Sequence, residues 1–277
     1  MKMKGFYGAR RTINTAAYCL FMLLLIGFFF APQLWLVTEA FDPNPGVYIK
    51  FFKPTLANFV NIFTEHNAAL YLKNTVILAA ESTLFTVLLV VMGGYALSRL
   101  KVPEIWIVVF WVTATIPLIT FLIPYYKFFR SLGLLNTILG CAIVFTAGRI
   151  PFYAWMMKNF FDTFPKDLEE AAAIDGANRL QVILRVVIPL SLPPIGLVAA
   201  MTFSMAWGDL LAPMVLLNKA SVMPLSVGML AEARPAVTWE LLWDIKIVTP
   251  FSIIHALPPV LLFIFAQKYL KGFATMT

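Results

Sequence analysis

Long apolar stretches alternate with short polar connections along most of the chain. A bilayer core about 30 Å thick needs about 20 helical residues, because each residue of an α-helix rises by 1.5 Å. Six stretches reach this length, at residues 13–37, 70–97, 105–129, 138–157, 189–217 and 247–267. We therefore predict an all-α, polytopic membrane protein with six transmembrane helices.

The composition supports a membrane protein and argues against a nucleic-acid-binding protein. Of the 277 residues 61% are hydrophobic and only 13% are charged, whereas about a quarter of the residues of a soluble domain are charged. The net charge of +7 comes from basic residues that flank the apolar stretches, without a basic block. We therefore expect membrane lipid to surround the chain, and we predict no nucleic-acid partner. Cys19 and Cys141 lie far apart in apolar runs and indicate neither a metal site nor a disulfide.

The distribution of basic residues also predicts the orientation. Six spans place both termini on one side, and the segments on that side carry more Lys and Arg than those on the other. This favours cytoplasmic termini in a plasma (inner) membrane. The expected organisation is an N-terminus and first helix at 1–37, an extracytoplasmic loop at 38–69 without helical periodicity, a core at 70–271 and a short cytoplasmic tail at 272–277.

The connection at residues 164–189 is a polar insert of good helix formers. Asp167 and Glu170 have the spacing of a capping box, and Glu169 adds negative charge near the helix start. Gly176 provides a helix stop, because glycine tolerates the left-handed conformation of a C-cap. Asn178 can cap a second helix that runs to Pro189. Physical reasoning alone leaves open whether this pair of helices rests on lipid headgroups or docks into a partner.

The same insert resembles the EAA loop of binding-protein-dependent importer permeases. Glu170-Ala171-Ala172 is followed after three residues by Gly176, and after nine more by Val186-x-Ile188-Pro189. The usual family ending is Ile-x-Leu-Pro, so this chain departs from it conservatively. Further segments are similar to the smaller permease subunit of maltose-type carbohydrate importers: residues 74–75, 94–99, 132–137, 151–155, 207–213 and 267–270.

The resemblance implies a mechanism and partners. In this family the EAA helix docks into a cytoplasmic ATPase dimer, and a second homologous permease and an extracytoplasmic solute-binding protein complete the importer. Glu170 would offer a carboxylate to the ATPase, and Arg179 would either add a polar contact or face lipid headgroups. The ATPase-coupling set is Asp167, Glu169, Glu170, Ala171, Ala172, Asp175, Gly176, Arg179 and Pro189. No Gly-Lys dipeptide, and so no phosphate-binding P-loop, occurs here. The chain is therefore expected to be no enzyme and to bind no cofactor, with ATP and Mg²⁺ on the partner ATPase.

Three ionisable residues lie inside predicted spans: Glu81, Arg149 and Asp209. Such groups normally face a bundle interior or a wet cavity, because charge in the bilayer core is costly. They either line a substrate path, or Glu81 and Arg149 form a structural pair. Trp207 beside Asp209 would suit a sugar, whose ring stacks on indole and whose hydroxyls need acceptors. The family often has Trp-Asn-Glu here, so Gly208 removes the amide.

A sugar is the expected substrate, and a polyol or a glycerol phosphate derivative is the alternative. A proton-coupled secondary transporter that uses Glu81 and Asp209 is a rival of another class, and a membrane scaffold is a weaker one. Both rivals leave the helix–glycine–helix insert without a function. The C-terminal tail is also shorter than in some relatives, where it reaches the ATPase.

Overall fold

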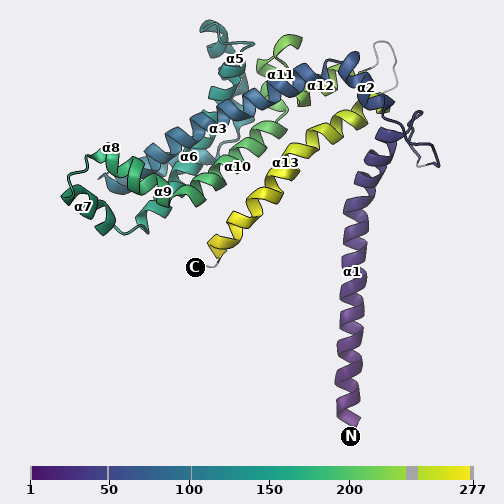
Figure 1. Cartoon of the computed structure of the whole chain (residues 1–277), viewed down its shortest axis with the longest axis horizontal. Coiled ribbons are helices and arrows are strands. Elements are labelled where there is room, and N and C mark those ends of the chain that lie inside the picture. Colours follow the sequence, from purple (N-terminus) through teal and green to yellow (C-terminus); the bar gives the residue numbers. More distant parts are fainter. Residues whose placement is uncertain (1, 49, 101, 235–242, 275–277) are drawn as a thin grey trace. The chain divides into compact units, whose positions relative to one another are not determined.

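The computed structural model describes residues 2–48, 50–100, 102–234 and 243–274, with side chains for all of these except 2–14, 16, 104 and 266–274. Every regular element among the described residues is a helix (Figure 1). The basic residues near the N-terminus and the whole predicted tail at 272–277 lie outside the described side chains. The chain divides into two compact units, one of residues 1–66 and 233–254 and the other of residues 67–232 and 255–277.

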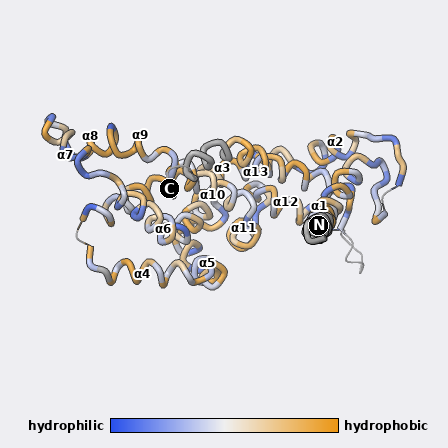
Figure 2. Tube along the Cα trace, turned by 90° about the horizontal axis from the view of Figure 1, so that it is seen from below, coloured by the Kyte–Doolittle hydropathy of each residue, from blue (hydrophilic) through white to orange (hydrophobic). Residues whose placement is uncertain are grey.

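The six predicted spans correspond to four single helices and two bent pairs, so the described residues contain four candidate spans, or six if each bent pair crosses the membrane once. The single helices that are long and apolar enough to cross a membrane are Ala17–Phe41, Ala68–Arg99, Ile138–Asp162 and Ile245–Phe265. The bent pairs are Ile105–Thr115 with Leu118–Ser131, at 89°, and Arg179–Leu190 with Leu192–Gly208, at 76°. In Figure 2 the hydrophobic colour follows the helices, and hydrophilic positions gather at the connection beside α7 and α8.

The smaller unit contains α1 (Lys2–Phe41), α2 (Ala57–Thr64) and the first residues of α13 (Ile245–Ala274). The buried Asn58 amide joins α2 to the end of α1, because its Nδ2 donates to the Ala40 carbonyl at 3.1 Å and to the Asp42 carbonyl at 2.7 Å. The expectation of a loop without a helix at 38–69 was therefore wrong at α2, a helix of 8 residues whose buried face is small.

The larger unit is built on the parallel helices α3 (Ala68–Arg99) and α6 (Ile138–Asp162), with α10 (Leu192–Gly208) packed on them. The two helices approach closely at Gly94. A Cβ there would lie 2.6 Å from Met157 Cβ and 3.0 Å from the Ala154 carbonyl oxygen, so the contact requires glycine. Two buried clusters fill this unit, one around Phe145 and Trp207 and one around Met157 and Phe161.

Shorter helices occupy the two ends of α3 and α6. Figure 1 shows α7 (Asp167–Ile174) and α8 (Arg179–Val182) at one end, and α11 (Leu211–Leu216) and α12 (Leu225–Glu232) at the other. The remaining elements of this unit are α4 (Glu104–Thr115), a 3-10 turn (Leu118–Phe121), α5 (Leu122–Ser131), a π-helix (Ile183–Val187), α9 (Ile188–Leu190) and a second 3-10 turn (Ala220–Val222).

Proline and serine explain the irregular entry into the fifth span. Pro189 has no N–H, so the carbonyl of Arg185 lacks its usual donor, and the preceding turn widens to a π-helix closed by the Ile188 N–H on the Ile183 carbonyl. The chain bends at Ser191, whose buried Oγ donates to the Val187 carbonyl at 2.6 Å. The helix of this span, α10, ends at Gly208 and is therefore shorter than the predicted span, which ran to residue 217.

Candidate functional site

The helix–glycine–helix insert forms as the local sequence predicts, with one exception. Gly176 has a φ of +86°, and the N–H groups of Gly176 and Ala177 bond to the carbonyls of Ala173 and Ala172, each at 3.0 Å. This pattern is a Schellman C-cap. Asn178 and Gln181 form a reciprocal capping box at the start of α8, with both bonds 2.9 Å long.

Asp167 does not act as the predicted cap. Helix α7 begins at Asp167 itself, the N-cap position is Lys166, and no side-chain bond closes this end. The acidic side chains of Asp167, Glu169 and Glu170 lie in the first turn, where they interact favourably with the positive end of the helix dipole. The carboxylates therefore act through charge at this helix start.

The two neighbouring glutamates of α7 point to different surroundings. Glu170 is exposed, as are Ala171 and Ile174, whose side chain is 86% exposed. Glu169 instead accepts from the Tyr95 hydroxyl at 2.7 Å and from Arg99 Nε and Nη2 at 2.8 and 2.7 Å. We refer to Tyr95, Ser98, Arg99, Asp162 and Glu169 as the Arg99 network.

The other residues of the predicted coupling set also fall into an inward-facing group and an exposed group. Ala172, a member of the predicted coupling set, packs against the cluster around Met157 and Phe161 and so faces inward. Exposed positions are occupied by Asp167, Asp175, Gly176, Arg179 and Pro189. The accessible surface of α7 is thus small and mostly apolar, with carboxylates beside it.

The Arg99 network was missed by the reasoning from sequence. Tyr95 and Arg99 lie four residues apart and so share one face of α3. Besides Glu169, Arg99 Nη1 donates to the Phe161 carbonyl at 2.9 Å and to Ser98 Oγ at 3.0 Å. Ser98 Oγ donates to Asp162 Oδ1 at 2.7 Å. The only signal was that Tyr95, Ser98 and Arg99 fall within the segment 94–99 that resembles the importer family.

The charged residues inside the spans do not form the structural pair that was considered. Among the described residues, no hydrogen bond or ion pair joins Glu81 to Arg149. Arg149 Nη1 donates to the Phe145 carbonyl at 3.0 Å, its guanidinium carbon lies 4.7 Å from the Phe145 ring centroid, and it interacts electrostatically with Asp209. Glu81 Oε2 and Arg149 Nε are both buried without a partner in the described structure.

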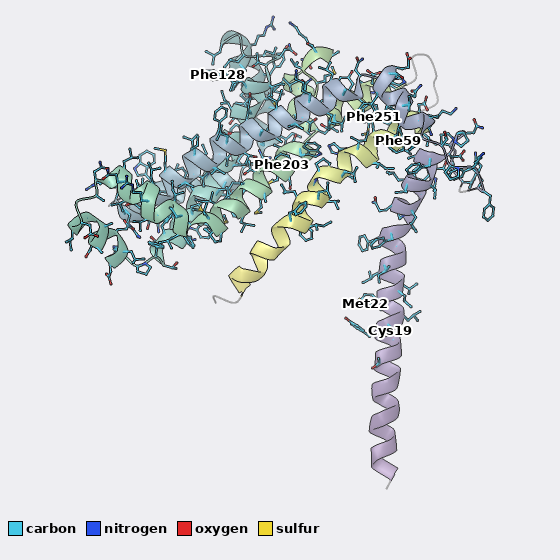
Figure 3. The ribbon with its side chains drawn as sticks, viewed as in Figure 1. Cys19, Met22, Phe59, Phe128, Phe203 and Phe251 are labelled. Carbon is cyan, nitrogen blue, oxygen red and sulfur yellow. The ribbon has the colours of Figure 1, made fainter. Side chains whose placement is uncertain are left out.

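Trp207 is a core residue in this structure, contrary to the prediction that it presents a stacking face to a sugar. The side chain is 1% exposed, and its Nε1 donates to the His255 carbonyl at 2.8 Å. Phe203, labelled in Figure 3, stacks on it with ring centroids 5.5 Å apart. Asp209 remains partly exposed, although its Oδ1 accepts from the Ala212 N–H at 3.1 Å at the start of α11.

A second set of contacts holds the far end of α3. Asn74 Nδ2 donates to the carbonyls of Ser221 and Met223, at 3.1 and 3.0 Å. Thr75 Oγ1 accepts from the Leu225 N–H at 2.7 Å, and the Tyr71 hydroxyl donates to Glu232 Oε1 at 2.7 Å. We refer to Tyr71, Asn74 and Thr75 as the Asn74 network. Nearby, Asn136 Oδ1 accepts from the N–H groups of Asn218 and Lys219.

Comparison with known proteins assigns the class of this molecule. Residues 90–271, more than half of the chain, match the family described as the binding-protein-dependent transport system inner membrane component. The chain therefore belongs to this family of importer permeases, in agreement with the fold and the insert.

Two individual relatives and one solved structure agree with this family assignment. The chain is 29% identical to the sulfoquinovosyl glycerol transport system permease protein SmoH of Agrobacterium fabrum, over 91% of this chain and 88% of the relative. It is 28% identical to the trehalose/maltose transport system permease protein MalG of Thermococcus litoralis, over 86% and 87%. Its fold matches a chain from the crystal structure of a bacterial ABC transporter that imports alginate, with a TM-score of 0.79, 21% identity and coverage of 94% and 97%.

Proposed function

We propose that this chain is the transmembrane subunit of an ATP-driven importer, in which α7 docks into a separate ATPase. The observation that carries the proposal is the surface of α7: Glu170, Ala171 and Ile174 are exposed together at one end of the α3–α6 pair. A short helix with small and apolar side chains fits a groove on a partner closely. ATP-driven closure of the ATPase would then move α7 and switch the pore between inward- and outward-facing states.

The importer would contain three further kinds of protein. A second homologous permease would complete the pore, an ATPase dimer would carry ATP and Mg²⁺, and an extracytoplasmic solute-binding protein would deliver the substrate. Docking to a cytoplasmic ATPase requires the loop at 164–189 to face the cytoplasm. That requirement agrees with the bias of Lys and Arg, which favours the cytoplasm for the side that carries both termini and this loop.

The proposed substrate is a sugar. The two relatives above are named for sulfoquinovosyl glycerol and for trehalose and maltose, and the matched fold belongs to a transporter involved in the import of a polysaccharide. Within this chain, Glu81, Arg149 and Asp209 are the proposed polar residues of the path. Buried polar atoms without a protein partner are normally satisfied by water or ligand, and both Glu81 and Arg149 carry one.

Co-purification tests the docking. The chain is expressed together with the products of its neighbouring genes, and ATP hydrolysis is measured in the preparation recovered on this chain. Glu170→Arg should abolish the recovered ATPase, because it reverses the exposed charge. Gly176→Trp should do the same, because a side chain is strained at a φ of +86°. Exposed Glu65, on the smaller unit, provides the matched charge-reversal control Glu65→Arg. Full ATPase recovery with both loop variants would contradict the proposal.

Uptake tests the path and the substrate. Cells that express the complete importer are supplied with radiolabelled maltose, trehalose and glycerol 3-phosphate in parallel. Saturable uptake of a sugar is the expected result, and uptake of glycerol 3-phosphate alone would overturn the assignment. Asp209→Asn removes the charge while it keeps the Oδ1 acceptor for Ala212. An unchanged rate and affinity in that variant would remove Asp209 from the path.

A further inference from the structure

We propose that Arg99 is a positioning residue, which acts through Glu169 to fix α7 on the end of α3 and to transmit its movement into the span. This inference rests on the proposed function, because it concerns how the docking helix is linked to the pore. It separates the adjacent glutamates of α7 into two roles: Glu170 faces the partner, and Glu169 faces the chain's own membrane helix.

The contact uses both oxygens of Glu169. Oε1 accepts from Arg99 Nε and Nη2, and Oε2 accepts from the Tyr95 hydroxyl. The Arg99 and Glu169 side chains are only 11% and 14% exposed. Charge-assisted bonds of this kind are about twice as strong as neutral ones, and the two arginine nitrogens also fix the direction of approach. Glu169 is therefore committed to this contact and is not available to a partner.

Arg99 also holds the segment that leads into α7. Its Nη1 donates to the Phe161 carbonyl in the last turn of α6, and its Nη2 donates to the Phe164 carbonyl beyond that helix. One guanidinium thus joins α3, the end of α6 and α7. A shift of α7 must displace Arg99 or break these bonds together.

The position of Arg99 on α3 makes this contact suitable for transmission. Gly94, between one and two turns away, is the point where α3 lies in backbone contact with α6. The Tyr95 ring packs edge-on against Phe161 of α6, with centroids 5.8 Å apart. Close-packed interfaces shift as units rather than deform gradually. Movement that reaches Arg99 therefore reaches the α3–α6 pair.

Consecutive residues on a helix do not face the same way, so the two glutamates provide a matched pair of variants. Glu169→Gln weakens the contact with Arg99, whereas Glu170→Gln leaves it intact. The first measurement is amide hydrogen exchange across residues 166–176 in the full-length chain purified alone. Exchange should accelerate by about tenfold in Glu169→Gln, because one charge-assisted bond is weakened. Glu170→Gln should match the wild type.

The second measurement uses the complex co-purified with its ATPase, with ATP and Mg²⁺ as the only additions. In the wild type, ATP should change the exchange of residues 90–99. Arg99→Ala should abolish that change while ATP hydrolysis stays within about twofold of the wild-type rate, because the nucleotide site lies on another chain. The double variant Arg99→Glu with Glu169→Arg restores opposite charges but not the bonds to the Phe161 and Phe164 carbonyls, and should recover part of the ATP-dependent change.

Each result bears on one part of the inference. Unchanged exchange at 166–176 in Glu169→Gln would show that Arg99 does not position α7. Faster exchange there, combined with a wild-type response to ATP at 90–99 in Arg99→Ala, would overturn the role in transmission. Failure of the charge-swapped pair to recover the response, with normal folding, would also overturn it. Absence of any ATPase from the wild-type preparation would refute the proposed function and the transmission role, while the exchange of α7 would still decide the positioning role.

Discussion

The two ends of α3 are fastened by different chemistry. At the Asn74 network an amide and a hydroxyl bond to backbone groups of residues 221–225, and Asn74 and Thr75 are 4% and 0% exposed. At the Arg99 network, ionised side chains bond mainly to one another near the surface. Neutral bonds made by buried side chains are lost only when the segment unfolds and depend little on salt, whereas a partly exposed contact between charges is weakened when salt screens it.

This difference indicates a fixed end and an adjustable end. The segment held by the Asn74 network includes the 3-10 turn Ala220–Val222 and the start of α12. In α12, Ser226 Oγ donates to the Asp209 carbonyl at 2.9 Å and so links this segment to Asp209. The segment held by Arg99 is the one proposed to dock on the ATPase. A transporter that couples a moving partner to its spans needs rigidity in the span and a reversible contact at the partner. Three substitutions test this contrast.

Asn74→Leu should have the largest effect on stability. It leaves the carbonyls of Ser221 and Met223 without the donor from the buried Asn74, and we expect a loss of about 3 kcal/mol in the free energy of unfolding. Thermal unfolding in detergent measures this as a lower midpoint, and the loss should be the same at low and high salt. The exposed Asn61 of α2 gives the control Asn61→Leu. A midpoint equal to that of the control would contradict the fixed end.

Arg99→Ala should have a smaller effect that depends on salt. Removal of the guanidinium takes away charge-assisted bonds at a partly hydrated site, with an expected loss of about 2 kcal/mol at low salt. At 1 M salt the Debye length falls to about 3 Å, so the gap in unfolding midpoint between wild type and variant should narrow. A gap that is independent of salt would mean that Arg99 acts by packing, and the contrast between the two ends would disappear.

Thr75→Val should have the smallest effect of the three. The substitution keeps the shape of the side chain and removes the acceptor of the Leu225 N–H and the donor to the Tyr71 carbonyl. We expect a loss of about 1 kcal/mol, measured by the same thermal unfolding and independent of salt. A stabilised or unchanged variant would show that the Leu225 N–H finds another acceptor, and that Asn74 alone holds this end.

Features that depend on a few neighbouring residues could be read from the sequence. The lengths of apolar runs predicted the six spans, and the glycine at 176 and the asparagine at 178 predicted a helix stop and a helix start. Asp167 failed as a cap although its spacing was suitable, because helix α7 starts one residue earlier than that role requires. A capping pattern fixes a helix end only when the backbone at that residue is not already helical.

Contacts between distant segments could not be read in this way. Arg99 and Glu169 are 70 positions apart, and Asn74 and Ser221 are 147 apart. Hydropathy indicates that a tryptophan or a glutamate lies in or beside a span, but not which neighbour faces it. Trp207 therefore appeared as a sugar-stacking residue, while its indole N–H bonds to the backbone of the last helix.

By itself, the sequence determined the membrane class, the spans and the helix–glycine–helix insert, because apolar run length and local backbone preferences are sufficient for these. The tertiary structure decided which glutamate of the insert faces outward, which alanine packs inward and where Trp207 points. The physical reason is that burial of a side chain depends on the packing of α3, α6 and α10 against one another. Only that packing turns Glu169 toward Arg99 and leaves Glu170 exposed.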